Sequence, residues 1–205
     1  MKEVKVCGLT RPADIEGVNI ARPDYCGFII NYPKSPRSLS ARDVVSLLGK
    51  LNPAIVPVGV FVDQPLEVVA SVLNSSGISV AQLHGQEDEA YIRRLRLLTD
   101  KPIWKAFEIQ GQADIIRAAK STADFLLLDA GKGGGIAFDW GLIDGFQRPF
   151  GLAGGLNLEN LPKALRTRAS ILDISSGVET GGVKDPEKIR SFIKTATSSG
   201  EKTSL

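Results

Sequence analysis

The chain of 205 residues is long enough to bury a full hydrophobic core, and its formal net charge of +2 leaves acids and bases nearly balanced. The charges form no basic stripe or acidic tail, which argues against nucleic acid, and no apolar run is long enough for a membrane span or a signal peptide. We therefore expect one cytoplasmic domain over residues 1–205, with a polar, frayed tail at about 198–205.

Short apolar runs alternate along the chain with amphipathic segments. The apolar runs predict eight strands, at 3–6, 25–30, 56–62, 79–83, 102–107, 125–128, 150–153 and 171–174. The segments that follow them predict eight helices, at 12–20, 41–48, 65–73, 87–98, 113–119, 139–143, 158–165 and 186–195. Ser40 and Asp185 suit helix N-caps, and Pro12, Pro65 and Pro186 suit first turns.

The predicted strands are apolar almost throughout, as expected when both faces of a parallel sheet are covered. Eight strands alternating with eight helices is the pattern of an α/β protein, a single-domain (β/α)8 TIM barrel of minimal length. A doubly wound open sheet is the alternative. It is disfavoured because the first turn, Cys7-Gly8-Leu9-Thr10, is not the G-x-G-x-x-G of a dinucleotide site.

The cysteines and the single histidine indicate the redox state of the thiols and whether a metal site is expected. Cys7 and Cys26 lie in apolar, strand-like runs, which favours two free thiols in a reducing compartment. Cys26 begins its strand and is expected to pack in the core. His84 is the only histidine and no Cys/His cluster has ligand spacing, so we expect no metal site.

Residues with no evident packing role cluster at the carboxyl ends of the predicted strands, where barrels place their chemistry. Cys7 ends the first strand and Asp129 ends the sixth. A base or nucleophile and an acid at two strand ends predict a proton-transfer site. Other unusual residues are Gln82, His84 and Gly85 at the end of the fourth strand, Arg37 after the second, and Asp173 within the eighth.

Two glycine-rich turns suggest an anion site. Gly154-Gly155 follows the seventh strand, and Ser175-Ser176-Gly177 follows the eighth. Each could be a simple turn, but barrels often bind phosphate at these two places through backbone N–H groups. The loop from Gly131 to Gly135 is either a mobile cover or a long turn, and Lys132 within it is read as a solvated lysine.

Several motifs, taken in order, resemble those of the phosphoribosylanthranilate isomerase family of tryptophan biosynthesis. They are K-V-C-G-L-T at 5–10, S-P-R at 35–37, Q-L-H-G at 82–85, F-D-W at 138–140, L-A-G-G-L at 152–156 and D-I-S-S-G-V-E at 173–179. The resemblance implies a (β/α)8 barrel that converts phosphoribosylanthranilate, a small-molecule substrate, by an Amadori rearrangement without a cofactor. It implies Cys7 as general base and Asp129 as general acid. It further implies Arg37 on the anthranilate carboxylate and Gly154, Gly155, Ser176 and Gly177 around the phosphate.

The chemistry of that reaction suits these residue types. A protonated Asp129 in a dry surrounding can donate to the ring oxygen, which opens the sugar to a Schiff base. A thiolate at Cys7 can then remove the C2 proton, provided that a nearby positive group favours the thiolate. Helix N-termini and Arg37 are the candidates for that group.

The remaining residues have plainer interpretations. His84 is expected to be a hydrogen-bonded structural residue near the site rim, and Asp173 to satisfy backbone donors or orient site groups. Trp104 is expected in the core, and Asp139-Trp140 is expected to cap and pack a short helix.

Two other functions stay open. One is a different sugar-phosphate enzyme on this barrel: an epimerase with metal ligands, an indole-forming synthase, or an aldolase, for which Lys105 is the only mid-strand candidate lysine. The other is a silent paralogue that binds a sugar phosphate. The sequence leaves open whether the protein is a monomer or a homodimer.

Overall fold

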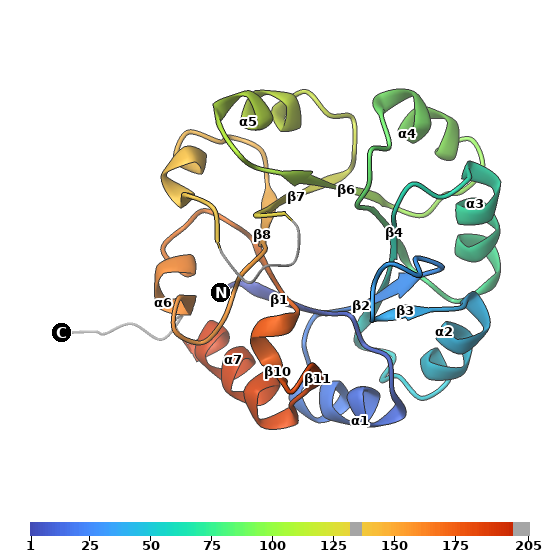
Figure 1. Ribbon diagram of the computed structural model, residues 1–205, viewed down its shortest axis with the longest axis horizontal. Coiled ribbons are helices and arrows are strands. Elements are labelled where there is room, and N and C mark those ends of the chain that lie inside the picture. Colours follow the sequence, from blue (N-terminus) through green and yellow to red (C-terminus); the bar gives the residue numbers. More distant parts are fainter. Residues whose placement is uncertain (132–136, 199–205) are drawn as a thin grey trace.

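The computed structural model describes residues 1–131 and 137–198, and eight parallel strands form its closed barrel (Figure 1). The strands lie in the order β1-β9-β8-β7-β6-β5-β4-β2, and β1 also pairs with β2, which closes the ring. Their bounds are β1 Glu3–Cys7, β2 Tyr25–Ile30, β4 Val56–Phe61, β5 Val80–Leu83, β6 Ile103–Glu108, β7 Phe125–Asp129, β8 Phe150–Ala153 and β9 Ile171–Ile174. The predicted (β/α)8 barrel is confirmed.

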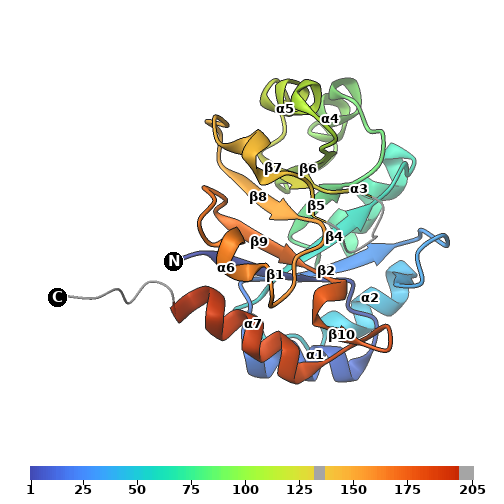
Figure 2. The ribbon, with the colours of Figure 1, turned by 60° about the vertical axis from the view of Figure 1, so that its left-hand side comes forward.

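Among the residues that the structure describes, seven α-helices surround the strands on the outside of the barrel (Figures 1 and 2). They are α1 Pro12–Ala21, α2 Ala41–Leu48, α3 Leu66–Ser75, α4 Glu89–Leu95, α5 Gln112–Ala119, α6 Leu161–Ala164 and α7 Pro186–Ser198. The segment predicted as a helix at 139–143 is instead a 3-10 helix, η1 Trp140–Ile143, which Asp139 caps by accepting from the Gly141 N–H.

Several helix ends differ from the prediction: α4, for example, covers Glu89–Leu95 rather than 87–98, and α3 runs on to Ser75 rather than ending at 73. α6 starts at Leu161 rather than 158, because Asn157 Oδ1 accepts from the backbone N–H groups of Glu159 and Asn160 and forms a turn there. α7 continues to Ser198, so the predicted fraying does not begin at that residue, and the rest of the predicted tail lies outside the described residues.

Within the described ranges, the structure has three short strands that were not predicted. β3 (Ser38–Leu39) pairs with the end of β2, and β10 (Glu179–Thr180) with β11 (Val183–Lys184) forms a hairpin after the 3-10 helix η2 (Ser176–Val178). Each has two residues, which is too short for a periodic pattern to identify. The hairpin follows the carboxyl end of β9 and carries two charged residues of the site described below.

The core has two apolar layers, one between the strands and the helices and one inside the barrel. Cys26 is fully buried in the outer layer and Trp104 lies in the inner layer, as predicted for both. Near the amino-terminal ends of the strands, the Trp104 ring lies 5.0 Å from the rings of Tyr25 and Phe125 and fills the barrel. The opposite end of the interior is polar, and this is where the site lies.

Most of the residues predicted as N-caps or first-turn prolines have those positions, Pro12 and Pro186 among them. Ser40 accepts from the Asp43 N–H at the start of α2, and Asp185 accepts from the Glu187 and Lys188 N–H groups at the start of α7. Pro65 is the exception: it is the N-cap of α3 rather than a first-turn residue.

Asp14 fixes the turn that connects β1 to α1. Its carboxylate is buried and accepts from the N–H groups of Thr10 and Arg11, at 2.8 and 3.0 Å, and from the Arg11 guanidinium. Asp43 has the equivalent third position of α2, where it accepts from Ser40, but it is exposed. The two residues therefore offer the same capping chemistry at different burial.

We expect Asp14→Ala to lower the free energy of unfolding by about 2 kcal/mol, because two backbone donors lose their acceptor in a buried turn. The matched change Asp43→Ala is expected to cost less than about 1 kcal/mol, since water replaces the lost partner. Urea unfolding followed by circular dichroism measures both. Equal losses in the two variants would contradict the importance of burial here.

Candidate active site

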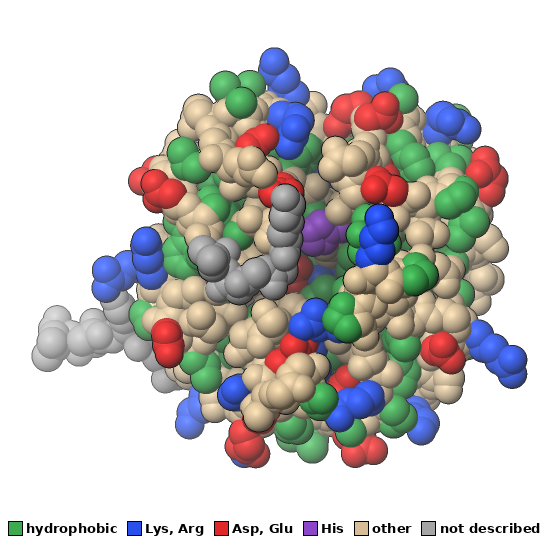
Figure 3. Space-filling model, viewed as in Figure 1, with side chains coloured by type: hydrophobic (Ala, Val, Ile, Leu, Met, Phe, Trp, Pro, Cys, Tyr) green, Lys and Arg blue, Asp and Glu red, His purple; other side chains and the backbone are tan. Residues whose placement is uncertain are grey.

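Cys7 and Asp129 lie at the same end of the barrel. Strand register places Lys5 opposite Asp173, Asp173 opposite Ala153, and Ala153 opposite Asp129. These four residues form one row across the inside of the barrel, near the carboxyl ends of the strands; we call that open end the mouth. Cys7 is two residues beyond Lys5 on the same face of β1, so it lies nearer the mouth than Lys5 does. Figure 3 shows charged side chains of both signs around the hollowed centre of this face.

A buried lysine lies directly beneath the thiol. Lys5 is fully buried inside the barrel, its Nζ donates to Asp173 Oδ2 at 2.8 Å, and its positive charge acts on the Cys7 thiol. A Cβ on Gly27 of the adjacent strand would lie 2.6 Å from Cys7 Sγ and 3.0 Å from Lys5 Nζ. The glycine therefore makes room for both groups.

Sequence reasoning missed Lys5 as a site residue, although a lysine between Val4 and Val6 in an apolar strand was a visible signal. It also makes the identification of Lys105 as the only mid-strand lysine wrong. Asp173 was expected to satisfy backbone donors or to orient site groups. The structure shows it paired with the Lys5 ammonium.

Opposing effects act on the protonation of this pair and the thiol. Burial raises the pKa of the Cys7 thiol, while the Lys5 and Lys184 ammonium groups work against that shift. Burial disfavours the Lys5 charge, but Asp173 and the Cys7 sulfur outweigh it and raise the pKa of Lys5. The chief cation beside the thiol is thus Lys5, and not one of the predicted candidates, Arg37 or a helix N-terminus.

Asp129 is held at the end of β7 by a turn and a histidine. Its Oδ1 accepts from the Gly131 N–H at 2.6 Å, and its Oδ2 lies 3.5 Å from His84 Nε2. The Gln82 amide lies 3.2 Å from His84 Nδ1; with the amide donating, the imidazole carries its proton on Nε2, toward Asp129. His84 is therefore hydrogen-bonded and lies beside Asp129, and its place at the rim of a site stays a prediction.

Arg37 is fixed over the mouth by an acid from the hairpin. Its Nε and Nη2 donate to the two oxygens of Glu179 at 2.7 and 2.6 Å, and Lys184 Nζ donates to Glu179 Oε1 at 2.5 Å. The Arg37 stem crosses Gly8, where a Cβ would lie 2.5 Å from Arg37 Cδ. Burial opposes ionisation of Glu179, but the hydrogen bonds from the two cations outweigh it and lower its pKa to about 2.

Glu179 and Lys184 were not recognised as site residues from the sequence. Charged residues in a two-residue strand look like ordinary surface positions, and only the pairing of β10 with β11 brings both side chains back toward the mouth. The E that ends the D-I-S-S-G-V-E motif was the available signal for Glu179.

The two glycine-rich turns lie against each other. Gly154 and Gly155 have positive φ angles of 80° and 68°, which few other residues adopt. A Cβ on Gly177, in η2, would lie 1.9 Å from the Leu156 carbonyl oxygen, so the turns after β8 and β9 pack at backbone distance. Ser176 begins η2 beside them. The other part of the predicted loop after Asp129, residues 132–135, lies outside the described residues.

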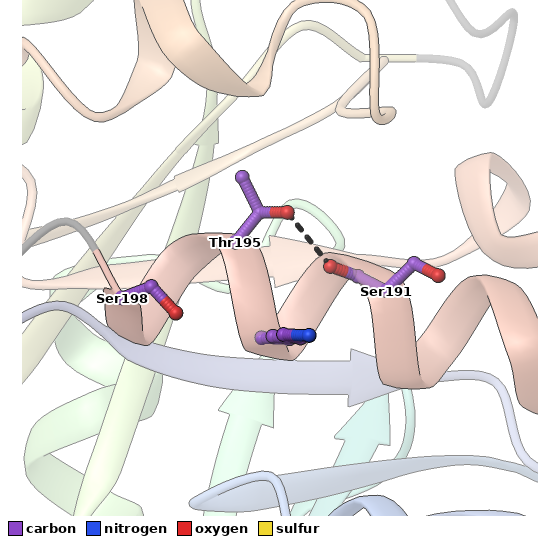
Figure 4. A pocket seen from close by; sticks show the side chains of 4 residues that line it. Ser191, Thr195 and Ser198 are labelled. Carbon is purple, nitrogen blue, oxygen red and sulfur yellow. Dashed lines mark hydrogen bonds between the residues drawn. The ribbon is translucent and has the colours of Figure 1, made fainter.

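A cleft of about 810 Å³ opens over β5 and β6 next to this site, and its walls include Tyr32, His84, Lys105, Glu108, Arg117 and Gly131. Lys105 is engaged there, with Nζ 2.9 Å from Glu87 and 2.7 Å from the Gly85 carbonyl oxygen. A second depression lies on α7, where Thr195 donates to the Ser191 carbonyl beside Lys194 and Ser198 (Figure 4). Its described lining residues all belong to α7 and include no acid.

Neither metal-ligand clusters nor membrane spans occur in the part of the chain that the structure describes. Within residues 1–131 and 137–198, no three His, Cys, Asp or Glu side chains are grouped so that they could hold a metal ion. In the same residues, no helix combines the length and hydropathy needed to cross a membrane.

A closed parallel barrel with a thiol, carboxylates and cations at its carboxyl end defines a (β/α)8-barrel enzyme. The family model described as N-(5'-phosphoribosyl)anthranilate (PRA) isomerase matches residues 4–195. A relative from Endomicrobium trichonymphae, an N-(5'-phosphoribosyl)anthranilate isomerase, is 40% identical over 200 residues, covering 95% of this chain and 98% of that one. The chain belongs to the N-(5'-phosphoribosyl)anthranilate isomerase family.

Solved structures agree with this assignment. A phosphoribosyl anthranilate isomerase in complex with reduced 1-(o-carboxyphenylamino)-1-deoxyribulose 5-phosphate is similar with a TM-score of 0.86 and 34% identity. Monomers of the dimeric isomerase from Thermotoga maritima are similar with a TM-score of 0.86 and 35% identity. In both cases the match covers 97% of this chain and 100% of the other.

The low pKa of Glu179 predicts a pH-dependent contribution to stability. Because its pKa is about 2 in the folded state against an ordinary 4.5, the stabilisation is complete above about pH 5 and disappears as the pH falls toward 2. Glu179→Gln should therefore lower the free energy of unfolding by about 2 kcal/mol at pH 7, after allowance for solvent screening. Urea unfolding at several pH values should show the variant and the parent converging between pH 5 and pH 2. A gap that stays constant over this range would contradict the ionised clamp.

Proposed function

We propose that the protein catalyses the Amadori rearrangement of N-(5'-phosphoribosyl)anthranilate to 1-(2-carboxyphenylamino)-1-deoxyribulose 5-phosphate, a step of tryptophan biosynthesis. Membership of the isomerase family and the similarity to an isomerase bound to a reduced form of this product support the reaction. The observation in the structure that carries the mechanism is the placement of Cys7 and Asp129 on strand ends around one mouth.

Asp129 acts as the general acid and Cys7 as the general base. Asp129 gives its proton to the ring oxygen as the nitrogen lone pair opens the sugar, which leaves a Schiff base and an aspartate carboxylate. The iminium acidifies the C2 proton, and the Cys7 thiolate takes it. The resulting enolamine tautomerises to the ketone. His84, 3.5 Å from Asp129 Oδ2, can stabilise the carboxylate that forms.

Arg37 binds the anthranilate carboxylate. Glu179 occupies the Nε side of its guanidinium, and no described residue accepts from Nη1, so the substrate would meet the Nη1 side of the planar fork. The glycine turns hold the phosphate through backbone N–H groups at Gly154, Gly155, Ser176 and Gly177. Binding of the remote phosphate aligns the sugar between the acid and the base.

The protein works without a cofactor in this proposal, because acid and base groups alone balance the proton transfers. We further propose a single domain over residues 1–205 that acts in the cytoplasm as a monomer or a homodimer. The solved Thermotoga maritima relative consists of monomers of a dimeric isomerase, which supports keeping both states.

The competing functions make different demands. An aldolase needs a free lysine in the site, whereas Lys105 is paired with Glu87 and Lys5 with Asp173. A silent paralogue would bind the product without turnover. An assay that generates phosphoribosylanthranilate in situ and follows the loss of its fluorescence separates these cases from the isomerase. Absence of fluorescence loss with folded protein would contradict the proposed reaction.

Cys7→Ala and Asp129→Asn are each expected to lower kcat by at least about 100-fold, because each removes one of the two proton-transfer groups. Both side chains are at the mouth, so the circular dichroism spectra and unfolding midpoints should remain close to those of the parent. Turnover within a few-fold of the parent in either variant would rule out that residue's role.

Gly177→Ala tests the phosphate site. A Cβ at this position collides with the Leu156 carbonyl, so the turns must separate and KM should rise at least tenfold, with a smaller fall in kcat. Gly145→Ala is the matched control, because a Cβ there meets no atom within 4 Å. Steady-state kinetics and inhibition by inorganic phosphate measure the effect. Unchanged phosphate inhibition in Gly177→Ala would place the anion elsewhere.

A further inference from the structure

Charged side chains from five segments surround the Cys7 thiol. Those in its immediate electrostatic environment are Lys5, Asp173 and Lys184, and Glu179 joins Lys184 to Arg37. Three of these groups are cations and two are carboxylates. With the thiol protonated, the cluster therefore carries one unbalanced positive charge, and a thiolate at Cys7 would neutralise it.

Both carboxylates of the cluster are already engaged by cations. Asp173 accepts from Lys5 at 2.8 Å, and Glu179 accepts from Arg37 with both oxygens and from Lys184 with one. Cys7 Sγ and Lys5 Nζ both lie beside Gly27, 2.6 and 3.0 Å from the place where its Cβ would be, and Lys5 is fully buried, where the low dielectric strengthens its attraction for an anion. The unbalanced charge thus acts on the sulfur.

The other acids and bases near the thiol do not supply the missing negative charge while Asp129 is protonated. Cys26 faces the outer apolar layer and is fully buried. His84 lies beside Asp129, and it is Asp129 whose register row continues across β8 to Asp173. A thiolate with a carboxylic acid, and a thiol with a carboxylate, give the mouth the same total charge.

We propose that Lys5 is a positioning residue: its buried charge, held in place by Asp173, stabilises one negative charge at the mouth. In each turnover this negative charge moves from Cys7 to Asp129. This rests on the isomerase reaction proposed above, in which Asp129 loses a proton and Cys7 gains one. The cycle closes when the thiol releases its proton to solvent and the carboxylate takes one up. No net charge appears in the buried site at any chemical step.

The geometry distinguishes this role from a merely structural ion pair. Asp173 Oδ1 is buried and has no hydrogen-bond partner among the described residues, so the Lys5–Asp173 pair is not saturated. A pair kept only for packing could be replaced by two apolar side chains without effect on the thiol. A pair that sets the charge at the thiol cannot.

The test is the rate at which iodoacetamide alkylates Cys7 in the whole protein as a function of pH, since only the thiolate reacts. Cys26 is fully buried, and Cys7→Ser supplies the background rate. Lys5→Met and Asp173→Asn break the same ion pair but change the local charge in opposite directions. At pH 7 we expect alkylation at least tenfold slower in Lys5→Met and several-fold faster in Asp173→Asn. Shifts in the same direction, or none, would overturn the proposal.

A second pair of variants covers the case in which a buried substitution prevents folding, which circular dichroism will show. Lys184→Gln and Glu179→Gln alter the hairpin rather than the barrel interior. They should shift the alkylation rate in the same opposite directions, by smaller factors. If both variants shift the alkylation rate in the same direction, Cys7 does not respond to the net charge of the cluster.

Turnover gives an independent readout. In Lys5→Met the alkaline rise of kcat should move to higher pH with little change in KM. The alkylation result does not depend on turnover, so the two proposals fail separately. If the wild-type protein has no isomerase activity but the variants shift the alkylation rate in opposite directions, the proposed reaction is wrong and the charge effect stands. If the enzyme is active but Lys5→Met leaves the alkylation rate of Cys7 unchanged, only the positioning role of Lys5 is wrong.

Discussion

The buried ion pair between Lys5 and Asp173 is the interaction on which the arrangement of the site depends. It joins β1 to β9. β1 carries the Cys7 thiol, and β9 leads into the Ser176 turn and the hairpin. Loss of one partner from such a pair typically costs about 3–5 kcal/mol because the other charge is left buried and alone. Closure of the barrel, where β1 pairs on both sides, is what places this pair inside the protein.

Segments outside the barrel strands supply the remaining charged residues of the site. The stretch before β3 brings Arg37 over Gly8, and the β10–β11 hairpin returns Glu179 to meet it. Because Glu179 binds Arg37 with both oxygens and Lys184 with one, the guanidinium is oriented before any ligand arrives. Such preorganisation lowers the entropy that binding would otherwise lose. The glycines at 8, 27 and 177 serve the same end, since a side chain at any of them would displace a neighbour.

The sequence predicted the barrel because its signals were local and repeated. Apolar runs of strand length, separated by helical segments, identified all eight barrel strands, and the strand-end rule brought Cys7, Asp129, Arg37 and His84 to one mouth. It failed where the signal was short or contradictory. The two-residue strands carry no period, and the helix at 139–143 is a 3-10 turn.

The amino-acid sequence by itself therefore determined the fold, the family and the positions of the thiol and the acid, because periodicity and motifs are properties of neighbouring residues. Only the tertiary structure decided which charges face each other. Lys5 meets Asp173 across 168 positions and Arg37 meets Glu179 across 142, and these pairings arise from strand register and barrel closure rather than from local pattern. The electrostatic environment of Cys7 is for this reason a product of the closed barrel.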